Sequence, residues 1–351
     1  MAKWQGKNLS VEIYGESHGE KVGAICHGFP EIKIDNQKLE SFLSRRKASS
    51  GVFSTTRIEP DNPVFSEISN GCVKGDFSVD IFNTNKKSKD YNELFARPRP
   101  SHADYCSYVK DGTLDFSGGG RFSARLTAPL CAVGGIAIQY LEKLGIRVHA
   151  YLSEVGSVKA KSYKSGAIDE SELLSMREDK IPSLSKKDEI IDEISKAKAD
   201  FDSVGGRVEC IVYGLKAGYG NNLFEGLEGK IASLVYAIPA VKGVEFGDGF
   251  DLCKMKGSIA NDSLRIKDGV IYTETNKAGG INGGISNGEQ ITLSVAFRPT
   301  PSIFKEQKTV DLEKKKNVTI QIKGRHDSCV AVRAVPCVES AVALAILDEI
   351  L

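Results

Sequence analysis

The segment from Leu126 to Gly145 constrains the fold most, because it is apolar on nearly every side at helical spacing. It contains the pair Gly134-Gly135, where another element can pack closely, and Gly145 is typical of a helix end. A helix that is apolar all round must be covered on all its faces. The segment therefore predicts a buried helix at the centre of the molecule.

The other periodic segments predict a mixture of strands and helices. Asp35 is a suitable N-cap for a helix over 36–47, and two more helices are predicted over about 225–236 and 336–350. The strands and helices follow no regular βαβ rhythm, which favours an α+β fold. The expected strands cover residues 9–17, 21–30, 146–156, 206–215 and 289–297.

We expect a single large domain over residues 1–351, with a charged peripheral segment of one or two helices at about 160–200. The formal net charge of +1 argues against a general nucleic-acid or membrane partner. The N-terminus lacks the apolar core of a signal peptide, and no apolar run reaches the ~20 residues of a membrane span, so a cytoplasmic protein is expected. The 8 cysteines are scattered without a Cys-x-x-Cys pair, which predicts reduced thiols and no metal site.

Glycines gather in four polar loops that contain the residues best suited to chemistry. Glycine lets the backbone approach a ligand closely, and the exposed N–H groups of such loops bind anions. None of the loops matches a P-loop or a dinucleotide fingerprint, which argues against ATP-dependent phosphoryl transfer. The loops are GESHG (15–19), SGGGR (117–121), KAGGINGGISNG (277–288) and KGR (323–325).

Three of the 5 histidines, His18, His102 and His326, lie in polar loops beside acidic or hydroxyl residues. Histidine exchanges protons readily near neutral pH, so these loops are candidates for acid–base chemistry. Asp327, next to His326, is either a base or one half of an ion pair. His27 and His149 lie in strand-like runs and are interpreted as structural or surface residues.

Arginines near these loops indicate an anionic ligand. Arg121 and Arg125 flank Ser123 at the start of the central helix, and a helix N-terminus with two guanidinium groups suits an anion. Arginine also pairs bidentately with carboxylate or phosphate. The further candidates are the Arg45-Arg46-Lys47 cluster, Arg57 and Arg298. Together with the histidines, they predict an acid–base enzyme that acts on a phosphorylated or carboxylated metabolite.

Six motifs, in order along the chain, resemble those of the chorismate synthase family, and the sequence is identified as a divergent, bacterial-type member. The resemblance extends from about residue 8 to 350 and is weakest in the charged 160–200 region. The motifs are GESHG, RPSHADY, GGGRFSARLTAP, IPAVKGVEFGDGF, AGGINGGISNGEQI and GRHDSCVAVRAVP.

The resemblance implies a lyase of the shikimate pathway of aromatic amino-acid biosynthesis. Such a lyase converts 5-enolpyruvylshikimate 3-phosphate to chorismate by 1,4-anti elimination of phosphate, and it requires reduced FMN without net redox change. The resemblance also implies a homotetramer whose subunits have central helices sandwiched between antiparallel β-sheets.

The resemblance also assigns roles by motif match. His18 would protonate the departing phosphate, His102 would protonate the reduced flavin, and Asp327 would act at the flavin N5, with Ser17 and Ser123 in support. Arg46, Arg57 and Arg125 are the candidates for binding the substrate anions. The implied flavin contacts are Arg121, Phe122, Ser123, Ala240, Gly283, Arg298, Pro299, Thr300, Pro301, Ser302 and Arg325.

The sequence departs from the family pattern in the basic segment over 45–57. The usual Arg-Arg-Arg-Pro-Gly is Arg45-Arg46-Lys47-Ala48-Ser49 here, and Val52 stands where a further arginine is usual; this segment is the one associated with NADPH contact. Ser101 also replaces the usual glycine before His102. An alternative hypothesis is therefore a flavin- or anion-binding homologue that has lost turnover, and a third is a phosphometabolite enzyme without flavin.

Overall fold

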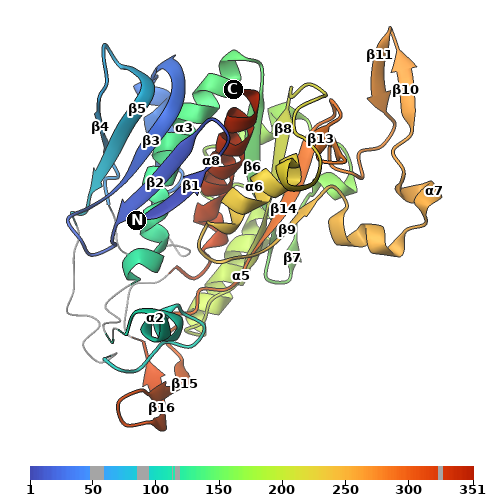
Figure 1. Cartoon of the computed structure of the whole chain (residues 1–351). Helices are drawn as coiled ribbons and strands as arrows, with labels where there is room; N and C mark the ends of the chain where they lie inside the picture. Colours follow the sequence, from blue (N-terminus) through green and yellow to red (C-terminus); the bar gives the residue numbers. More distant parts are fainter. Residues whose placement is uncertain (48–58, 85–94, 113, 115–118, 323–326) are drawn as a thin grey trace.

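The computed structural model describes residues 1–47, 59–84, 95–112, 114, 119–322 and 327–351. Two five-stranded antiparallel sheets enclose a layer of helices between them (Figure 1). This arrangement confirms the predicted α+β fold with central helices sandwiched between antiparallel sheets. Of the sequence-predicted site residues, Arg57, Arg325 and His326 lie outside the described residues, as does Val52.

The first sheet is formed by the N-terminal part of the chain. Its central strand β3 pairs antiparallel with β2 on one side and with β5 on the other, and the pairing with β5 shifts in register between Cys26 and Ile32. The strand order is β1 (Ala2–Gln5), β2 (Ser10–Gly15), β3 (Lys21–Lys33), β5 (Cys72–Phe82) and β4 (Pro63–Ser66).

The second sheet lies on the other side of the helices and is also antiparallel. Successive side chains of β8 point to opposite faces of the sheet. Val208, Cys210 and Val212 pack against the helices in the main core, and the residues between them point to the other face. The strand order is β7 (Val158–Lys159), β6 (Arg147–Val155), β8 (Gly206–Tyr213), β14 (Ile291–Phe297) and β9 (Val241–Phe246).

Two long helices, α3 (Thr127–Lys143) and α8 (Ala331–Ile350), form the centre of the sandwich. They pack against each other, while α3 also contacts β3 and β5 of the first sheet and α8 contacts β6 and β8 of the second (Figure 1). Two shorter helices, α1 (Asn36–Ser44) and α6 (Leu227–Tyr236), extend this layer beside α3 and α8 respectively.

The predicted central helix is confirmed as α3, most of whose residues are buried. The span Ala124–Lys143 is the one helical segment of the described chain long and apolar enough to cross a membrane, and 83% of its most apolar stretch is buried inside the protein. It is therefore a core helix. The α1 prediction is also confirmed, because the Asp35 carboxylate accepts a hydrogen bond from the Lys38 N–H at 3.1 Å.

The C-terminal helix was predicted to begin at Pro336, but α8 begins at Ala331, so Pro336 lies inside it. Two acidic residues inside this apolar helix are satisfied by distant partners. The carboxylate of Glu339 accepts hydrogen bonds from Arg45, and that of Asp348 accepts the N–H groups of residues 7, 8 and 9. Buried charges of this kind require such partners.

The remaining elements lie around the sandwich. Their bounds are α2 (Asp104–Asp111), α4 (Glu170–Ser175), α5 (Lys187–Ala199), α7 (Gly257–Ala260), β10 (Leu264–Lys267), β11 (Val270–Thr273), β12 (Ile281–Asn282), β13 (Ile285–Ser286), β15 (Glu306–Asp311) and β16 (Lys316–Gln321). The charged region contains two helices, α4 and α5, each with an apolar side buried against the body. The β10–β11 hairpin projects away from the molecule, and the β15–β16 hairpin lies near α2 (Figure 1).

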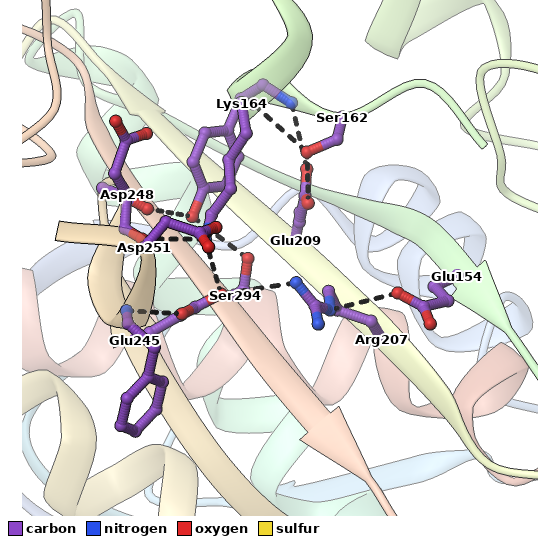
Figure 2. Close-up of polar contacts among 12 residues, drawn as sticks. Glu154, Ser162, Lys164, Arg207, Glu209, Glu245, Asp248, Asp251 and Ser294 are labelled. Carbon is purple, nitrogen blue, oxygen red and sulfur yellow. Dashed lines mark hydrogen bonds and ion pairs between the residues drawn. The ribbon is translucent and has the colours of Figure 1, made fainter. Parts of the chain in front are cut away.

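A polar network covers the face of the second sheet that points away from the helices (Figure 2). The buried carboxylate of Glu209 accepts hydrogen bonds from Tyr151 Oη at 2.5 Å and Ser162 Oγ at 2.6 Å. Lys164 Nζ lies 2.8 Å from Glu245 Oε1 and also donates to the Asp248 carbonyl. These bonds fix the segments around residues 162–164 and 245–251 to the sheet.

Candidate active site

A cavity of about 560 Å³ lies at the end of the sandwich where α3 and α8 begin. Its walls come from segments far apart in the sequence: the turn after β2, the end of α1, the approach to α2, the residues before α3, the start of β9 and the chain after β14. The two helix N-termini place the positive ends of their dipoles at this site. The cavity is therefore suited to an anionic ligand.

The cavity is strongly cationic although the chain as a whole is nearly neutral. Positive side chains outnumber negative ones among its lining residues, which concentrates positive potential in one place. The cationic residues of the lining are Arg46, Arg99, Arg121, Arg125, Lys242, Arg298 and Arg333, and the anionic ones are Glu59, Asp61 and Asp327.

Two buried arginines share one carboxylate at the inner wall. Arg46, just after α1, and Arg125, just before α3, bind the two different oxygens of Asp61. Asn83 Oδ1 accepts a further hydrogen bond from Arg125 Nε at 2.9 Å. Burial raises the pKa of Asp61, but the charges of Arg46 and Arg125 and their hydrogen bonds outweigh it, so the pKa lies below its usual range.

The two guanidinium groups keep donors for a ligand. Arg46 Nε and Arg125 Nη2 are buried and make no hydrogen bond to the described part of the protein, and the same holds for Thr300 Oγ1. Buried polar groups of this kind are expected to find a partner. Because one carboxylate serves two arginines, an anion bound beside them would balance the remaining positive charge.

His102 is held by an aspartate that sequence reasoning had not singled out. His102 Nδ1 lies 2.6 Å from Asp104 Oδ1 and 3.2 Å from Arg99 Nη2, and the shorter, charge-assisted contact indicates that Nδ1–H donates to Asp104. Arg99 binds the same carboxylate through Nε and Nη2, each at 2.7 Å. Nε2 is thus the ring nitrogen that can exchange a proton with a ligand.

Burial raises the pKa of Asp104, but the hydrogen bonds and charges of Arg99 and His102 lower it well below its usual range. Asp104 is therefore a carboxylate at neutral pH. Ser101, just before His102, has a φ of +58°. Glycine adopts this left-handed conformation without strain, so the backbone at this position favours glycine over serine.

Asp327 lies on the cavity wall in an ion pair with α8. Both of its oxygens contact Arg333 Nη1, at 3.1 and 2.9 Å, and Arg333 Nε donates to the carbonyl of Arg46 at 2.9 Å. Arg333 thus connects Asp327 to the Arg46–Asp61–Arg125 group. Of the two sequence-based alternatives for Asp327, the ion pair is present, and the side chain also lines the cavity, where a base could act.

The turn that carries Ser17 and His18 contacts the glycine loop before α3. The N–H of Ser17 lies 3.4 Å from the carbonyl of Gly120, and both Ser17 and His18 line the cavity. Ser123 caps the turn that leads into α3, because its Oγ accepts from the N–H of Arg125 at 3.2 Å. The guanidinium of Arg121 pairs with Asp111 and lies over the Phe122 ring.

The opposite wall combines apolar groups with backbone. Ala240 has a φ of +74°, and its carbonyl accepts the N–H of Arg298 at 3.0 Å, which joins the start of β9 to the chain after β14. The apolar lining residues on this side include Ile238, Pro239 and Val330. A cationic wall facing an apolar wall suits a ligand with both a flat ring and anionic groups.

The structure brings most of the sequence-predicted site residues together. Gly283 lies instead in the turn between β12 and β13 and does not line the cavity. Pro299 does not line it either, although its neighbours Arg298 and Thr300 do. The residues that do line it are His18, His102, Asp327, Ser17, Ser123, Arg121, Phe122, Ala240, Arg298, Thr300, Pro301, Ser302, Arg46 and Arg125.

One part of the arginine prediction is wrong. Arg45 was grouped with Arg46 as a sign of an anionic substrate, but Arg45 is bound to Glu339 of α8 at 2.5 and 3.1 Å and is buried away from the cavity. Sequence reasoning also missed Asp61, Asp104 and Arg333. Asp104 and Arg333 lie within the quoted motifs, whereas nothing near Asp61 in the sequence marks its role.

Comparison with known proteins identifies the family. The chorismate synthase family model matches residues 9–351. The chorismate synthase of Korarchaeum cryptofilum is 42% identical over 350 residues, covering 99% of this chain and 96% of the relative. That of Thermococcus gammatolerans is 41% identical and covers 99% and 97%, and that of Phocaeicola vulgatus is 41% identical and covers 98% and 96%.

A crystal structure of chorismate synthase has the same fold. It superposes with a TM-score of 0.74 at 23% sequence identity, covering 99% of this chain and 92% of that one. The sequence matches extend over almost the whole chain and include the segments that line the cavity. This chain therefore belongs to the chorismate synthase family.

Proposed function

We propose that this protein is a chorismate synthase, which converts 5-enolpyruvylshikimate 3-phosphate to chorismate and phosphate by 1,4-anti elimination. Full-length identity of about 40% to curated chorismate synthases supports the activity. The observation that carries the proposal for the site is the cationic cavity, in which His18, His102 and Asp327 come together from three separate loops.

The substrate carries a phosphate and two carboxylates, which the arginines of the cavity can bind. Arg46 and Arg125 offer buried N–H groups at the inner wall, beside the N-terminus of α3. Asp61 holds the two guanidinium groups in place, so little reorganisation is needed when an anion binds. Arg57, by motif match, is a third candidate for this role.

The family requires reduced FMN, and the residues present fit such a group. The cavity volume of about 560 Å³ lies in the usual range of ligand sites, and its walls combine apolar groups with cations. When bound, the reduced flavin supplies an electron-rich ring that stabilises the electron-deficient allylic centre of the substrate. The cavity-lining residues that would hold it are Arg121, Phe122, Ser123, Ala240, Arg298, Thr300, Pro301 and Ser302, together with Arg325 by motif match.

Acid–base residues of this chain handle the protons. His18, supported by Ser17, donates a proton to the departing phosphate oxygen, which makes phosphate a better leaving group. His102 offers Nε2 for proton transfer at the cavity, while Asp104 fixes Nδ1–H. Asp327, oriented by Arg333, would act as a base at the flavin N5.

The assembly proposed is a homotetramer. Apolar residues of the projecting β10–β11 hairpin are exposed, with Ile266 73% and Val270 66% accessible in the single chain. Exposed apolar patches of this kind are typical of subunit interfaces. We also place the enzyme in the cytoplasm, because all 8 cysteines are free thiols, which suits a reducing compartment.

The decisive experiment is an anaerobic assay with reduced FMN and the phosphorylated substrate. We expect equimolar phosphate and chorismate to appear. Binding of FMN without phosphate release would instead support the homologue that has lost turnover. A protein that binds no FMN even with substrate present would support the enzyme without flavin. Sedimentation equilibrium tests the tetramer independently.

A further inference from the structure

A pair of thiols lies where α3 and α8 pack against each other at the cavity. Cys131 Sγ on α3 is 3.7 Å from Cys337 Sγ on α8, and both side chains are buried. Gly134 and Ser340, about one turn further along the two helices, are also in close contact, so the helices run side by side in the same direction. The pair is therefore positioned by rigid helix packing.

We propose that Cys131 and Cys337 form a reversible disulfide when the protein meets hydrogen peroxide, with Cys337 reacting first and Cys131 resolving. The proposal concerns the thiols of this chain alone and does not rest on the proposed function. It assigns a modification site to the wall of the cavity, next to the residues that bind the ligand.

The surroundings of the two thiols make Cys337 the nucleophile. Among the described cysteines, Cys337 is the one that lines the cavity, so a small oxidant can reach it. The hydrogen bond from Cys131 and the positive charge of Arg46 lower the pKa of Cys337, whereas burial raises the pKa of Cys131. The thiolate is the reactive form of cysteine, so reaction begins at Cys337.

The chemistry is a two-electron oxidation that needs only peroxide. The Cys337 thiolate attacks one peroxide oxygen, the O–O bond breaks, and a sulfenic acid and hydroxide form. The Cys131 thiol then attacks the Cys337 sulfur, the S–O bond breaks, and the S–S bond forms with loss of water. The sum is two thiols and one hydrogen peroxide giving one disulfide and two waters.

The bond requires the two sulfurs to move closer together. The sulfurs must approach from 3.7 Å to a disulfide length of about 2.05 Å. The bond would link residues 131 and 337, on the two central helices, and thus constrain the unfolded chain strongly. We therefore expect the oxidised protein to melt several degrees higher than the reduced protein, and thiol reagents to reverse the change.

The test uses full-length protein in which the exposed Cys106 and Cys253 are replaced by serine, to limit surface oxidation. The protein is treated with hydrogen peroxide, alkylated and digested, and peptides are identified by mass spectrometry. We expect a cross-linked peptide joining Cys131 to Cys337, lighter than the two reduced peptides by two hydrogen atoms. Cys26 and Cys210, buried elsewhere, serve as internal controls and should remain alkylatable after denaturation.

Two variants separate the roles of the thiols. In Cys131→Ser, Cys337 should stop at the sulfenic acid and be labelled by dimedone. In Cys337→Ser, Cys131 should remain a thiol. The proposal is overturned if the parent protein keeps both thiols, or if Cys131 oxidises equally well without Cys337. The parent measurement decides even if a variant fails to fold.

Discussion

Gly134 on α3 lies so close to Ser340 on α8 that a Cβ at Gly134 would be 2.2 Å from the Cβ of Ser340 and 2.6 Å from its Cα. No side-chain rotation removes a clash with backbone, so the helices must separate. We predict that Gly134→Ala lowers the free energy of unfolding by about 1–3 kcal/mol, because overpacking outweighs the gain in helix propensity of about 1 kcal/mol. Urea denaturation measures the change.

The matched control is Gly229→Ala in α6. Gly229 is exposed, and a Cβ there would meet no atom within 4 Å. Only helix propensity then acts, so a gain of roughly 0.5–1 kcal/mol is expected. Equal effects of the two substitutions would show that α3 and α8 can move apart at no cost.

Asp61 is predicted to hold the anion site together. Asp61→Asn keeps the size of the side chain but leaves Arg46 and Arg125 buried without a counter-charge, which costs about 3–5 kcal/mol. Added inorganic phosphate should then raise the melting temperature of the variant more than that of the wild type, because the anion replaces the lost charge. Thermal melts across a phosphate titration measure both effects.

The control for Asp61 is Asp76→Asn, which removes an exposed partner of His27. We expect it to leave the melting temperature and the phosphate response unchanged. If Asp61→Asn behaved like Asp76→Asn, the two arginines would not depend on the shared carboxylate.

Asp104 is predicted to act through His102. His102→Ala should lower kcat by about 10²–10⁴-fold, the usual contribution of a general acid–base group. Asp104→Asn should also lower kcat while KM changes little, because the amide no longer fixes the Nδ1–H of His102. Steady-state kinetics under anaerobic conditions give both constants.

A double-mutant cycle distinguishes this positioning role from a separate contribution. In the His102→Ala background, Asp104→Asn should add almost nothing to the loss of kcat. Additive losses in the double variant would mean that Asp104 supports the loop or the ligand independently of His102.

Asp327 is predicted to be a base that Arg333 orients. Asp327→Asn should lower turnover about 10²–10⁴-fold with little change in melting temperature. Arg333→Lys keeps the positive charge but loses the paired contacts to Asp327 and Arg46, so a smaller loss is expected. If Asp327→Asn kept wild-type turnover while Arg333→Lys was inactive, Asp327 would not act as a base and its ion pair with Arg333 would be purely structural.

The sequence predicted what local patterns determine and missed what depends on contacts between distant segments. The segment that forms α3 is apolar on all sides, and that property alone requires a central position. The start of α8 was missed because Pro336 is typical of a first helical turn, yet the chain is already helical at Ala331. Glu339 interrupts the apolar pattern of this helix, and its partner Arg45 comes from the other end of the chain.

The same limit applies to the cavity. His18, His102 and Asp327 lie in polar loops that stand out in the sequence. Asp61 does not stand out, because its role arises only when it meets Arg46 after α1 and Arg125 before α3. The sequence also could not predict that Arg45 and Arg46 have different partners. Adjacent residues after a helix end point in different directions, and only the packing of α8 decides which one pairs with Glu339.

Stability is predicted to fall in acid because three buried carboxylates have lowered pKa values. Burial alone would raise the pKa of Asp61, Asp104 and Glu339. In each case the arginine partners have a larger effect in the opposite direction, so the pKa lies below its usual value. Each group therefore stabilises the fold fully above its unfolded pKa of about 4, and this contribution is lost as the pH falls through the lower folded pKa. Unfolding takes up protons in that range, so the free energy of unfolding should rise with pH there by about 1.4 kcal/mol per pH unit for each proton.

Urea denaturation between about pH 2 and pH 6, at about 25 °C, measures this slope. The double variant Arg45→Met with Glu339→Gln removes one of the three carboxylates together with its partner. The introduced amide oxygen can still accept the Ala150 N–H, which Glu339 binds at 2.8 Å, so the fold should survive. The slope of the variant should be smaller by about 1.4 kcal/mol per pH unit, which corresponds to one proton. An unchanged slope would mean that folding does not shift the pKa of Glu339, and that the Arg45 contact does not stabilise its charge.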